Sequence, residues 1–157
     1  MHDPSGRLLE LVCKLDAMAP VASLVDLAQA VESAQLTLAD VQAYVEENPR
    51  NYNRALVALR EHYELLVMTW LPGQSSVPHD HAGSTCAMQV VQGEAREGSY
   101  RVAPDGYVDL DYETRIRAGE VTSGQDAGVH TVLNPANRGE LLVTVHAYAP
   151  PLKDFRR

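Results

Sequence analysis

The sequence predicts a mainly-β protein, a barrel or jelly roll of short strands that follows a helical N-terminal segment. Before residue 48, apolar residues recur at helical spacing. After it, short apolar runs alternate with Gly and Pro turn signals. A chain of 157 residues is also the usual size of one domain. We therefore expect a single domain, residues 1–157, in which helices from residues 1–48 pack on a barrel formed by residues 49–157.

Three amphipathic helices are expected, in residues 5–18, 21–34 and 38–47. Leu8, Leu11 and Leu15 give the first helix one apolar stripe. Ser5 and Thr37 are suitable N-caps for the first and third helices. The helical character ends at Asn48-Pro49, because a residue before proline avoids the helical conformation.

Strands are expected wherever short apolar runs lie between turn signals in the second part of the chain. These runs are residues 54–59, 64–71, 90–91, 100–102, 107–112, 114–116, 120–122, 129–133 and 141–148. Pro104-Asp105-Gly106 predicts a hairpin between two of them. Pro72-Gly73 and Asn134-Pro135 mark further turns.

Composition and charge exclude several classes of partner. The net charge of −8 and the pI near 5.1 disfavour nucleic acid, which is itself a polyanion. No apolar run approaches the ~20 residues that a membrane span needs. The first ten residues lack the layout of a signal peptide, and the two cysteines lie far apart, so a reducing cytoplasm is the expected location.

Two histidines, His79 and His81, stand one residue apart after Pro78. On a strand, such residues point to the same face, so both imidazoles can reach one point. His130 falls in a separate strand-like run. Three imidazoles from two places can bind one divalent metal, of which Fe, Zn, Cu and Ni all suit this ligand. For an isolated His-x-His, the alternative of surface or core histidines would be preferred.

Residues at fixed spacing around this pair resemble the first cupin motif, namely Gly73, His79, His81, Cys86 and Gly93. The family usually has Glu where Cys86 stands. The second cupin motif is met in part by His130 and Asn134. Without the Glu, a three-histidine site is similar to that of the cysteine dioxygenase branch of the cupins. This resemblance implies a cupin β-barrel.

The resemblance extends from about Tyr52 to Leu152 and includes Trp70 and the final Pro150-Pro151. Tyr52-Asn53-Arg54 is similar to the family's Tyr-x-Arg, which implies that Arg54, helped by Tyr52, holds a substrate carboxylate. The last strand is similar to the family's Ser/Thr-x-His-x-Tyr. It carries Thr144, His146 and Tyr148, which alternation places on one face.

The implied activity is the oxidation of L-cysteine by O2 to cysteine sulfinate at Fe(II) held by His79, His81 and His130. Tyr148, His146 and Cys86 are the expected catalytic residues, with Thr144 and Trp70 supporting them. In part of the family, the cysteine at position 86 is joined by a thioether to the tyrosine at position 148. The expected state is a monomer, although no residue pattern decides it.

Three alternatives remain open at the level of sequence. A 3-mercaptopropionate dioxygenase commonly has Gln in place of Arg54 and lacks Cys86, and both differences favour cysteine here. A non-catalytic metal- or ligand-binding cupin would leave Arg54 and the row on the last strand without a role. A zinc-dependent hydrolase or isomerase would need a general base, and no carboxylate stands at motif spacing, since Asp80 would face away from its neighbours on a strand.

Overall fold

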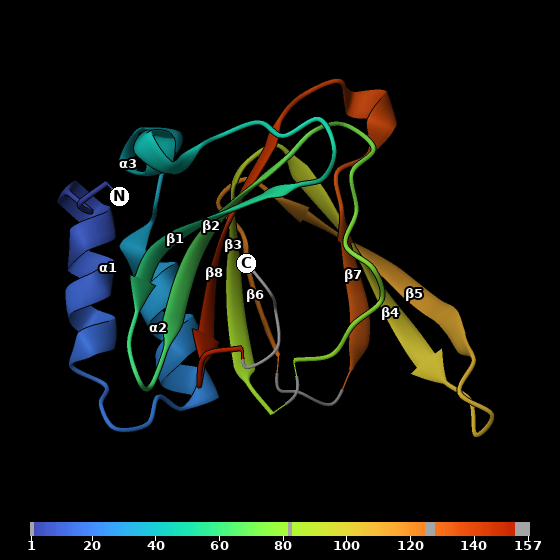
Figure 1. The fold of residues 1–157 in the computed structure, drawn as a ribbon, viewed down its shortest axis with the longest axis horizontal. Helices are drawn as coiled ribbons and strands as arrows, with labels where there is room; N and C mark the ends of the chain where they lie inside the picture. The colour runs from blue at the N-terminus through green and yellow to red at the C-terminus, as the bar shows by residue number, and fades with distance from the viewer. Residues whose placement is uncertain (1, 82, 125–127, 153–157) are drawn as a thin grey trace.

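The structure is a computed structural model that describes residues 2–81, 83–124 and 128–152. Helices α1 (Gly6–Asp16), α2 (Leu24–Ala34) and α3 (Leu38–Val41) precede the strands, and a 3₁₀ turn, η1 (Gln42–Tyr44), follows α3. The strands are β1 (Asn53–Leu59), β2 (Glu64–Trp70), β3 (Thr85–Gln92), β4 (Glu94–Val102), β5 (Val108–Arg117), β6 (Val121–Gly124), β7 (Val129–Leu133) and β8 (Leu142–Ala149), with a second 3₁₀ turn, η2 (Ala136–Arg138), before β8. The predicted mainly-β fold with a helical N-terminal segment is confirmed (Figure 1).

The helices begin and end where local hydrogen bonding dictates. The Ser23 hydroxyl accepts from the Asp26 amide at the start of α2. Gln35 takes the left-handed conformation that ends this helix. Thr37 and Asp40 form a capping box that starts α3. The third helix is shorter than predicted, since it tightens into η1 after Val41 and the chain is extended by Val45.

The strands form two antiparallel sheets. The larger has the order β1-β2-β8-β3-β6 and the smaller the order β5-β4-β7. Figure 1 shows the two sheets facing each other, with α1 and α2 on the far side of the larger sheet. Helix α2 contacts β3, β6 and β8, so the helices cover that sheet's outer face.

Strand β8 lies in the middle of the larger sheet and is buried along its whole length. Val143, Val145 and Ala147 belong to the apolar cluster shared with the helices. Leu142 and Tyr148 belong to a second cluster, inside the barrel. The strand therefore separates two cores, because alternate side chains point to opposite faces.

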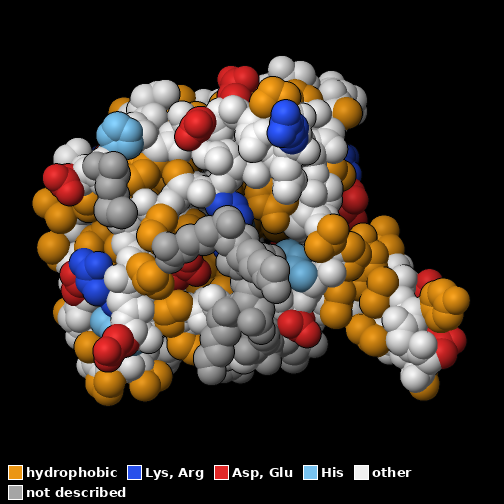
Figure 2. Space-filling model, in the orientation of Figure 1, with side chains coloured by type: hydrophobic (Ala, Val, Ile, Leu, Met, Phe, Trp, Pro, Cys, Tyr) orange, Lys and Arg blue, Asp and Glu red, His pale blue; other side chains and the backbone are white. Residues whose placement is uncertain are grey.

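Strands β4 and β5 form a hairpin arm that projects from the barrel, as Figures 1 and 2 show on the right. The predicted strand at residues 114–116 is the end of β5, not a separate element. Arg96 pairs with Glu113 on the outer face, and Arg101 pairs with Asp111 further along the arm. Apolar side chains of the arm are exposed, namely Val102, Tyr107, Val108, Leu110 and Tyr112.

The helices of the described part of the chain are too short to span a lipid bilayer.

Candidate metal centre

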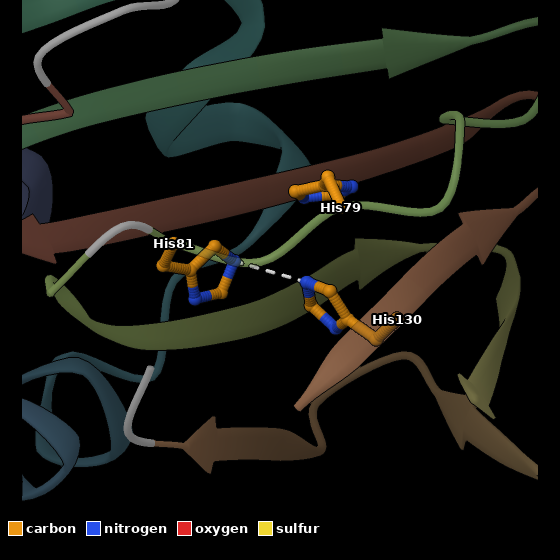
Figure 3. A group of neighbouring side chains, drawn as sticks. All are labelled: His79, His81 and His130. Carbon is orange, nitrogen blue, oxygen red and sulfur yellow. Dashed lines mark hydrogen bonds between the residues drawn. The ribbon is translucent and has the colours of Figure 1, made fainter. Parts of the chain in front are cut away.

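Three histidines converge between the two sheets (Figure 3). His130 lies on β7, while His79 and His81 lie in the loop between β2 and β3. The expectation that the pair sits on a strand was wrong, since neither residue is part of one. Pro78, which has no N–H to donate, precedes His79. His79 instead forms an isolated bridge to His130, with backbone hydrogen bonds of 3.0 and 2.9 Å.

The ligand atoms of these histidines all lie within 4.8 Å of one another. The Nε2 atoms of His81 and His130 are 2.9 Å apart. Adjacent nitrogens bound to one ion at about 2.0–2.1 Å lie roughly 2.8–3.4 Å apart in octahedral or tetrahedral geometry. The donor set therefore fits a divalent metal after small movements of the rings, and three imidazoles suit Fe, Zn, Cu or Ni.

Two of the rings are anchored through the nitrogen that points away from the cluster. His79 Nδ1 lies 2.8 Å from the Val77 carbonyl oxygen. His130 Nδ1 lies 2.8 Å from Oε1 of Glu97. Burial lowers the pKa of His79, and the Val77 carbonyl opposes this shift only in part. A lowered pKa favours the neutral imidazole, which is the form that binds metals.

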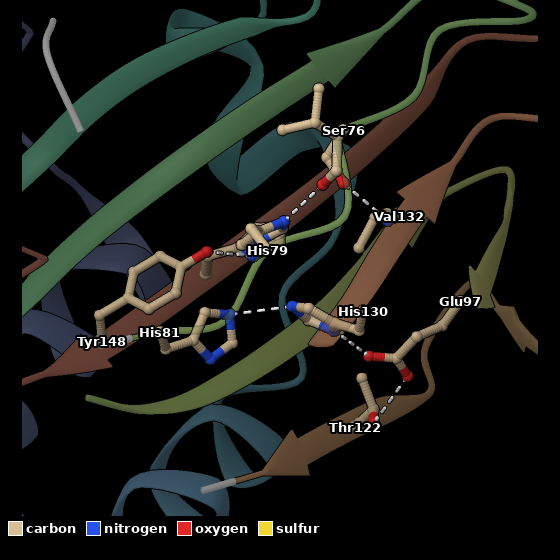
Figure 4. A network of polar contacts seen from close by, with 10 residues as sticks. Ser76, His79, His81, Glu97, Thr122, His130, Val132 and Tyr148 are labelled. Carbon is tan, nitrogen blue, oxygen red and sulfur yellow. Dashed lines mark hydrogen bonds and ion pairs between the residues drawn. The ribbon is translucent and has the colours of Figure 1, made fainter. Parts of the chain in front are cut away.

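Glu97 was not among the site residues predicted from the sequence. Arg96-Glu97 reads as a charged surface pair, yet Glu97 faces inward on β4 beside the histidines (Figure 4). Its other oxygen, Oε2, accepts from the Thr122 hydroxyl at 3.4 Å. The alternation of Ala95, Glu97 and Ser99 from Gly93 onward is the signal that could have placed this carboxylate inside. Motif spacing alone, which offered no carboxylate for the site, could therefore not identify Glu97.

A row of hydrogen bonds crosses the inner face of β8. Trp70 Nε1 donates to Oγ1 of Thr144 at 2.9 Å, and Thr144 Oγ1 lies 2.9 Å from Nε2 of His146. His146 Nδ1 lies 3.1 Å from the Tyr148 hydroxyl. All four side chains are buried. The shared face of Thr144, His146 and Tyr148, predicted from their alternation, is present in the structure.

Burial keeps the members of this row neutral. It lowers the pKa of His146 well below the usual value, and the positive charge of Arg54 lowers it further. Burial also raises the pKa of Tyr148 well above its usual value, and nearby Cys86 adds to the effect. At pH 7, the row consists of a neutral imidazole between two hydroxyls.

Cys86 lies directly opposite Tyr148, because the two residues are register partners on β3 and β8. Both are buried, and directly opposed side chains of antiparallel strands lie on the same face of the sheet. Burial raises the pKa of the Cys86 thiol, and a hydrogen bond with Tyr148 offsets part of that shift. The thiol is therefore protonated at neutral pH.

Arg54 and Tyr52 reach the histidines from β1 and the residues before it. A small cavity of about 20 Å³ is lined by Tyr52, Arg54, Met68, Trp70, Ser76, His79, His130, Val132, His146 and Tyr148. The Tyr52 ring stacks on Trp70, with centroids 4.1 Å apart. The arginine and the tyrosine predicted as a pair therefore share one cavity with two of the histidines.

A larger cavity of about 230 Å³ lies on the other side of the cluster. Its lining includes His81, His130, Cys86, Glu97 and Ser99. His130 and His146 line both cavities, so the histidines stand between them. The structure thus brings together every residue that the sequence predicted for the site, although Thr144 joins through its hydrogen bonds and lines neither cavity.

Comparison with solved structures identifies the architecture. A Klebsiella pneumoniae protein with a double-stranded β-helix domain matches with a TM-score of 0.57 and 24% identity, over 70% of this chain and 81% of the other. A Thermus thermophilus protein matches with a TM-score of 0.60 and 20% identity, over 71% and 95%. An RmlC-like cupin from Desulfovibrio desulfuricans matches with a TM-score of 0.53 and 18% identity, over 68% and 90%. The predicted cupin fold is confirmed.

Comparison with sequences places the chain within that fold. Cysteine dioxygenase type 1 of Danio rerio is 26% identical over 132 residues, which are 80% of this chain and 65% of that protein. The Bos taurus protein of the same name is 29% identical over 126 residues, 77% of this chain and 62% of that protein. The chain thus spans less than two thirds of the length of these relatives. The family model described as cysteine dioxygenase type I matches residues 7–157, so the chain belongs to the cysteine dioxygenase type I family.

Proposed function

We propose that this protein is a thiol dioxygenase that oxidises L-cysteine with O2 to cysteine sulfinate, with Fe(II) held by His79, His81 and His130. One observation carries the proposal. Two of the three histidines line the same cavity as Arg54. One small molecule can therefore place its thiol at a metal bound by the histidines and its carboxylate at Arg54. Membership of the cysteine dioxygenase type I family supports the same reaction.

Arg54 would bind the substrate carboxylate. Its planar guanidinium matches both carboxylate oxygens, and a charged hydrogen bond inside a cavity is stronger than one at the surface. Tyr52 lies on the same cavity wall and is held by its stacking on Trp70. A substrate fixed at this end presents its thiol toward the histidines with little freedom of orientation, which lowers the entropic part of the barrier.

The row on β8 would direct a proton into the cavity. Trp70 can only donate, so the Thr144 oxygen accepts from it. With the Thr144 hydroxyl donating to Nε2 of His146, Nδ1 carries the imidazole proton and donates to the Tyr148 oxygen. In this arrangement every member is satisfied and Tyr148 keeps its own hydroxyl proton. Tyr148 can then donate that proton to the substrate or to dioxygen.

When bound, iron would supply the redox chemistry that joins dioxygen to a coordinated thiolate. Both oxygen atoms end on sulfur, so the reaction needs no external reductant. The three imidazoles carry no charge, which favours an anionic ligand such as a thiolate. The buried walls around His146 and Tyr148 keep water away from the reacting groups.

We further propose a thioether between Cys86 and Tyr148. Their opposed positions on β3 and β8 and the hydrogen bond between their side chains support it. Forming the bond replaces the Cys86 S–H and one Tyr148 ring C–H by an S–C bond, a two-electron oxidation in which dioxygen takes up the two electrons and two protons as hydrogen peroxide. Intact-mass analysis should show a loss of about two mass units after aerobic turnover, and the loss should disappear in Cys86→Ser. A fully active enzyme of unchanged mass would contradict this part of the proposal.

Oxygen uptake tests the activity directly. The iron-loaded protein should consume O2 with L-cysteine and form cysteine sulfinate, with slower uptake on 3-mercaptopropionate and cysteamine. Replacing Arg54 by Ala should raise KM for cysteine far more than for cysteamine, which has no carboxylate. Arg60→Ala is the matched control, because Arg60 pairs with Asp16 at 3.0 Å and lines neither cavity.

The alternatives predict different results. A preference for 3-mercaptopropionate over cysteine would identify the protein as a dioxygenase for that thiol. Metal binding without O2 uptake on any thiol would indicate a non-catalytic cupin and reject the dioxygenase. Equal effects of Arg54→Ala on cysteine and cysteamine would remove Arg54 from the carboxylate role.

A further inference from the structure

The contact between Glu97 and His130 has no role in the reaction described above. Glu97 lies on β4, the central strand of the smaller sheet, where it is paired with Thr114 on one side and Val132 on the other. Its backbone is therefore fixed by two neighbouring strands. Its side chain is 20% exposed, and that of His130 is 17% exposed. A partly buried carboxylate held this rigidly is stabilised when it is paired.

The hydrogen bond to Glu97 determines which nitrogen of His130 faces the other histidines. An ionised carboxylate can only accept, so the proton must reside on Nδ1 of His130. The lone pair of the neutral ring is then on Nε2, the atom that lies 2.9 Å from Nε2 of His81. The hydrogen bond between Glu97 and His130, drawn in Figure 4, therefore favours one tautomer and one direction of the His130 ring.

His79 is anchored in the same manner but by a neutral group. Its Nδ1 lies 2.8 Å from the carbonyl oxygen of Val77. Both anchors leave Nε2 for the cluster, but of these two anchors only Glu97 carries a full negative charge. Three neutral imidazoles leave the charge of a divalent ion uncompensated, and a carboxylate bonded to one of them increases the basicity of that ligand.

We propose that Glu97 is a positioning residue that holds His130 in the Nδ1–H tautomer and supplies negative charge to a divalent metal bound by His79, His81 and His130. The proposal rests on the metal site of the proposed function but not on the oxidation of any thiol. Glu97 would act through His130, because its two oxygens are already engaged by His130 and Thr122.

Three variants separate charge from hydrogen bonding. Glu97→Gln keeps an acceptor for His130 but removes the charge, whereas Glu97→Ala removes both. Glu113→Gln is the control, since Glu113 is a carboxylate of the same sheet that pairs with Arg96 on the outer face. Far-UV circular dichroism checks that each variant folds, and Glu97→Gln serves as the test if Glu97→Ala does not fold.

The first measurement uses the metal-free protein. Nitrogen-15 NMR of the imidazole rings should show His130 as the Nδ1–H tautomer in the wild type and in Glu113→Gln. Glu97→Ala should show a mixture of both tautomers. An unchanged tautomer in Glu97→Ala would overturn the positioning role, and this result does not depend on catalysis.

The second measurement is the affinity for Co²⁺, followed by its d–d absorption. Glu97→Gln should bind about tenfold more weakly and Glu97→Ala about 10–100-fold more weakly, as is typical when the partner of a metal-bound histidine is removed. The Glu113→Gln control should stay within about twofold of the wild type. Wild-type affinity in both Glu97 variants, or no Co²⁺ binding by the wild type, would overturn the proposal. If affinity falls as expected but the iron-loaded wild type oxidises no thiol, then the role of Glu97 stands and the dioxygenase proposal fails.

Discussion

The Thr144 hydroxyl joins Trp70 to His146, so removing it tests the whole row on β8. Thr144→Val replaces the hydroxyl by a methyl group of nearly the same volume and leaves the packing unchanged. The Trp70 Nε1–H then loses its acceptor and Nε2 of His146 loses its donor. Both side chains are almost fully buried, at 1% and 4% exposure, so each loses its protein partner in an environment with little contact with bulk water.

The expected cost follows from these two contacts. A buried polar group left without a partner costs about 1–3 kcal/mol. Two such groups should lower the free energy of unfolding of Thr144→Val by about 3 kcal/mol. Thr144→Ser keeps the hydroxyl and loses one buried methyl group, which should cost only about 1 kcal/mol. The isosteric variant should therefore be the less stable of the two, the reverse of what packing alone predicts.

Urea unfolding of the metal-free proteins measures this difference. The chain has a single tryptophan, so the indole N–H signal of Trp70 in a nitrogen-15 spectrum reports the same contact directly. That signal should exchange with solvent faster and shift in Thr144→Val but not in Thr144→Ser. Equal stability of the two variants together with an unchanged indole signal would refute the hydrogen-bonded row.

Three further predictions follow from the geometry of the barrel. The clustered histidines come from β7 and from the loop before β3, so a bound metal joins the two sheets. Co²⁺ at 100 times its Kd should therefore raise the free energy of unfolding by about 2.7 kcal/mol. An unchanged Tm would contradict this site. Because the pKa of His146 is lowered in the folded protein, the unfolded chain binds more protons below pH 6.5. The free energy of unfolding should therefore fall by up to about 1.4 kcal/mol per pH unit as the pH decreases, and the metal-free His146→Phe variant should lose this part of the pH dependence. Identical pH dependence of urea unfolding in the two proteins would show that His146 is not buried as a neutral ring. A Cβ at Gly98 would lie 2.8 Å from Oγ1 of Thr131, so Gly98→Ala should lower the free energy of unfolding by about 1–3 kcal/mol. Gly124→Ala is the control and should lower it much less, because a Cβ there meets nothing within 4 Å. Similar denaturation midpoints for the two variants would argue against the close contact.

The features that the sequence predicted well are those set by local periodicity. The row on β8 follows from alternation alone, because Thr144, His146 and Tyr148 must share a face wherever the strand lies. The helical segment follows from its apolar stripe, and the hairpin from Pro104-Asp105-Gly106. Family resemblance supplied Arg54, which a weakly apolar run could not have distinguished from Arg50 or Arg60.

The features that were missed depend on contacts between distant segments. His79 and His81 have the spacing of a strand, but their loop pairs with β7 only through isolated bridges at Ser75 and His79, so they converge on His130 without forming a ladder. The charge of Glu97 beside Arg96 is typical of a surface, and only its alternation with Ala95 and Ser99 indicates an inward position. Its partner, His130, lies 33 residues away in sequence, and only the pairing of β4 with β7 brings them together.

The burial of β8 on both faces has a consequence for how this sequence can vary. Its even-numbered residues face the site and its odd-numbered residues pack against the helices, so every position along the strand is constrained against substitution. Inserting or deleting one residue in β8 would exchange the two sets and destroy the core and the site in a single event. The exposed tip of the β4–β5 arm, residues 103–107, packs neither in the core nor against the site. Length changes and grafted segments are tolerated at exposed turns of this kind, so natural relatives and engineered versions can differ most freely there.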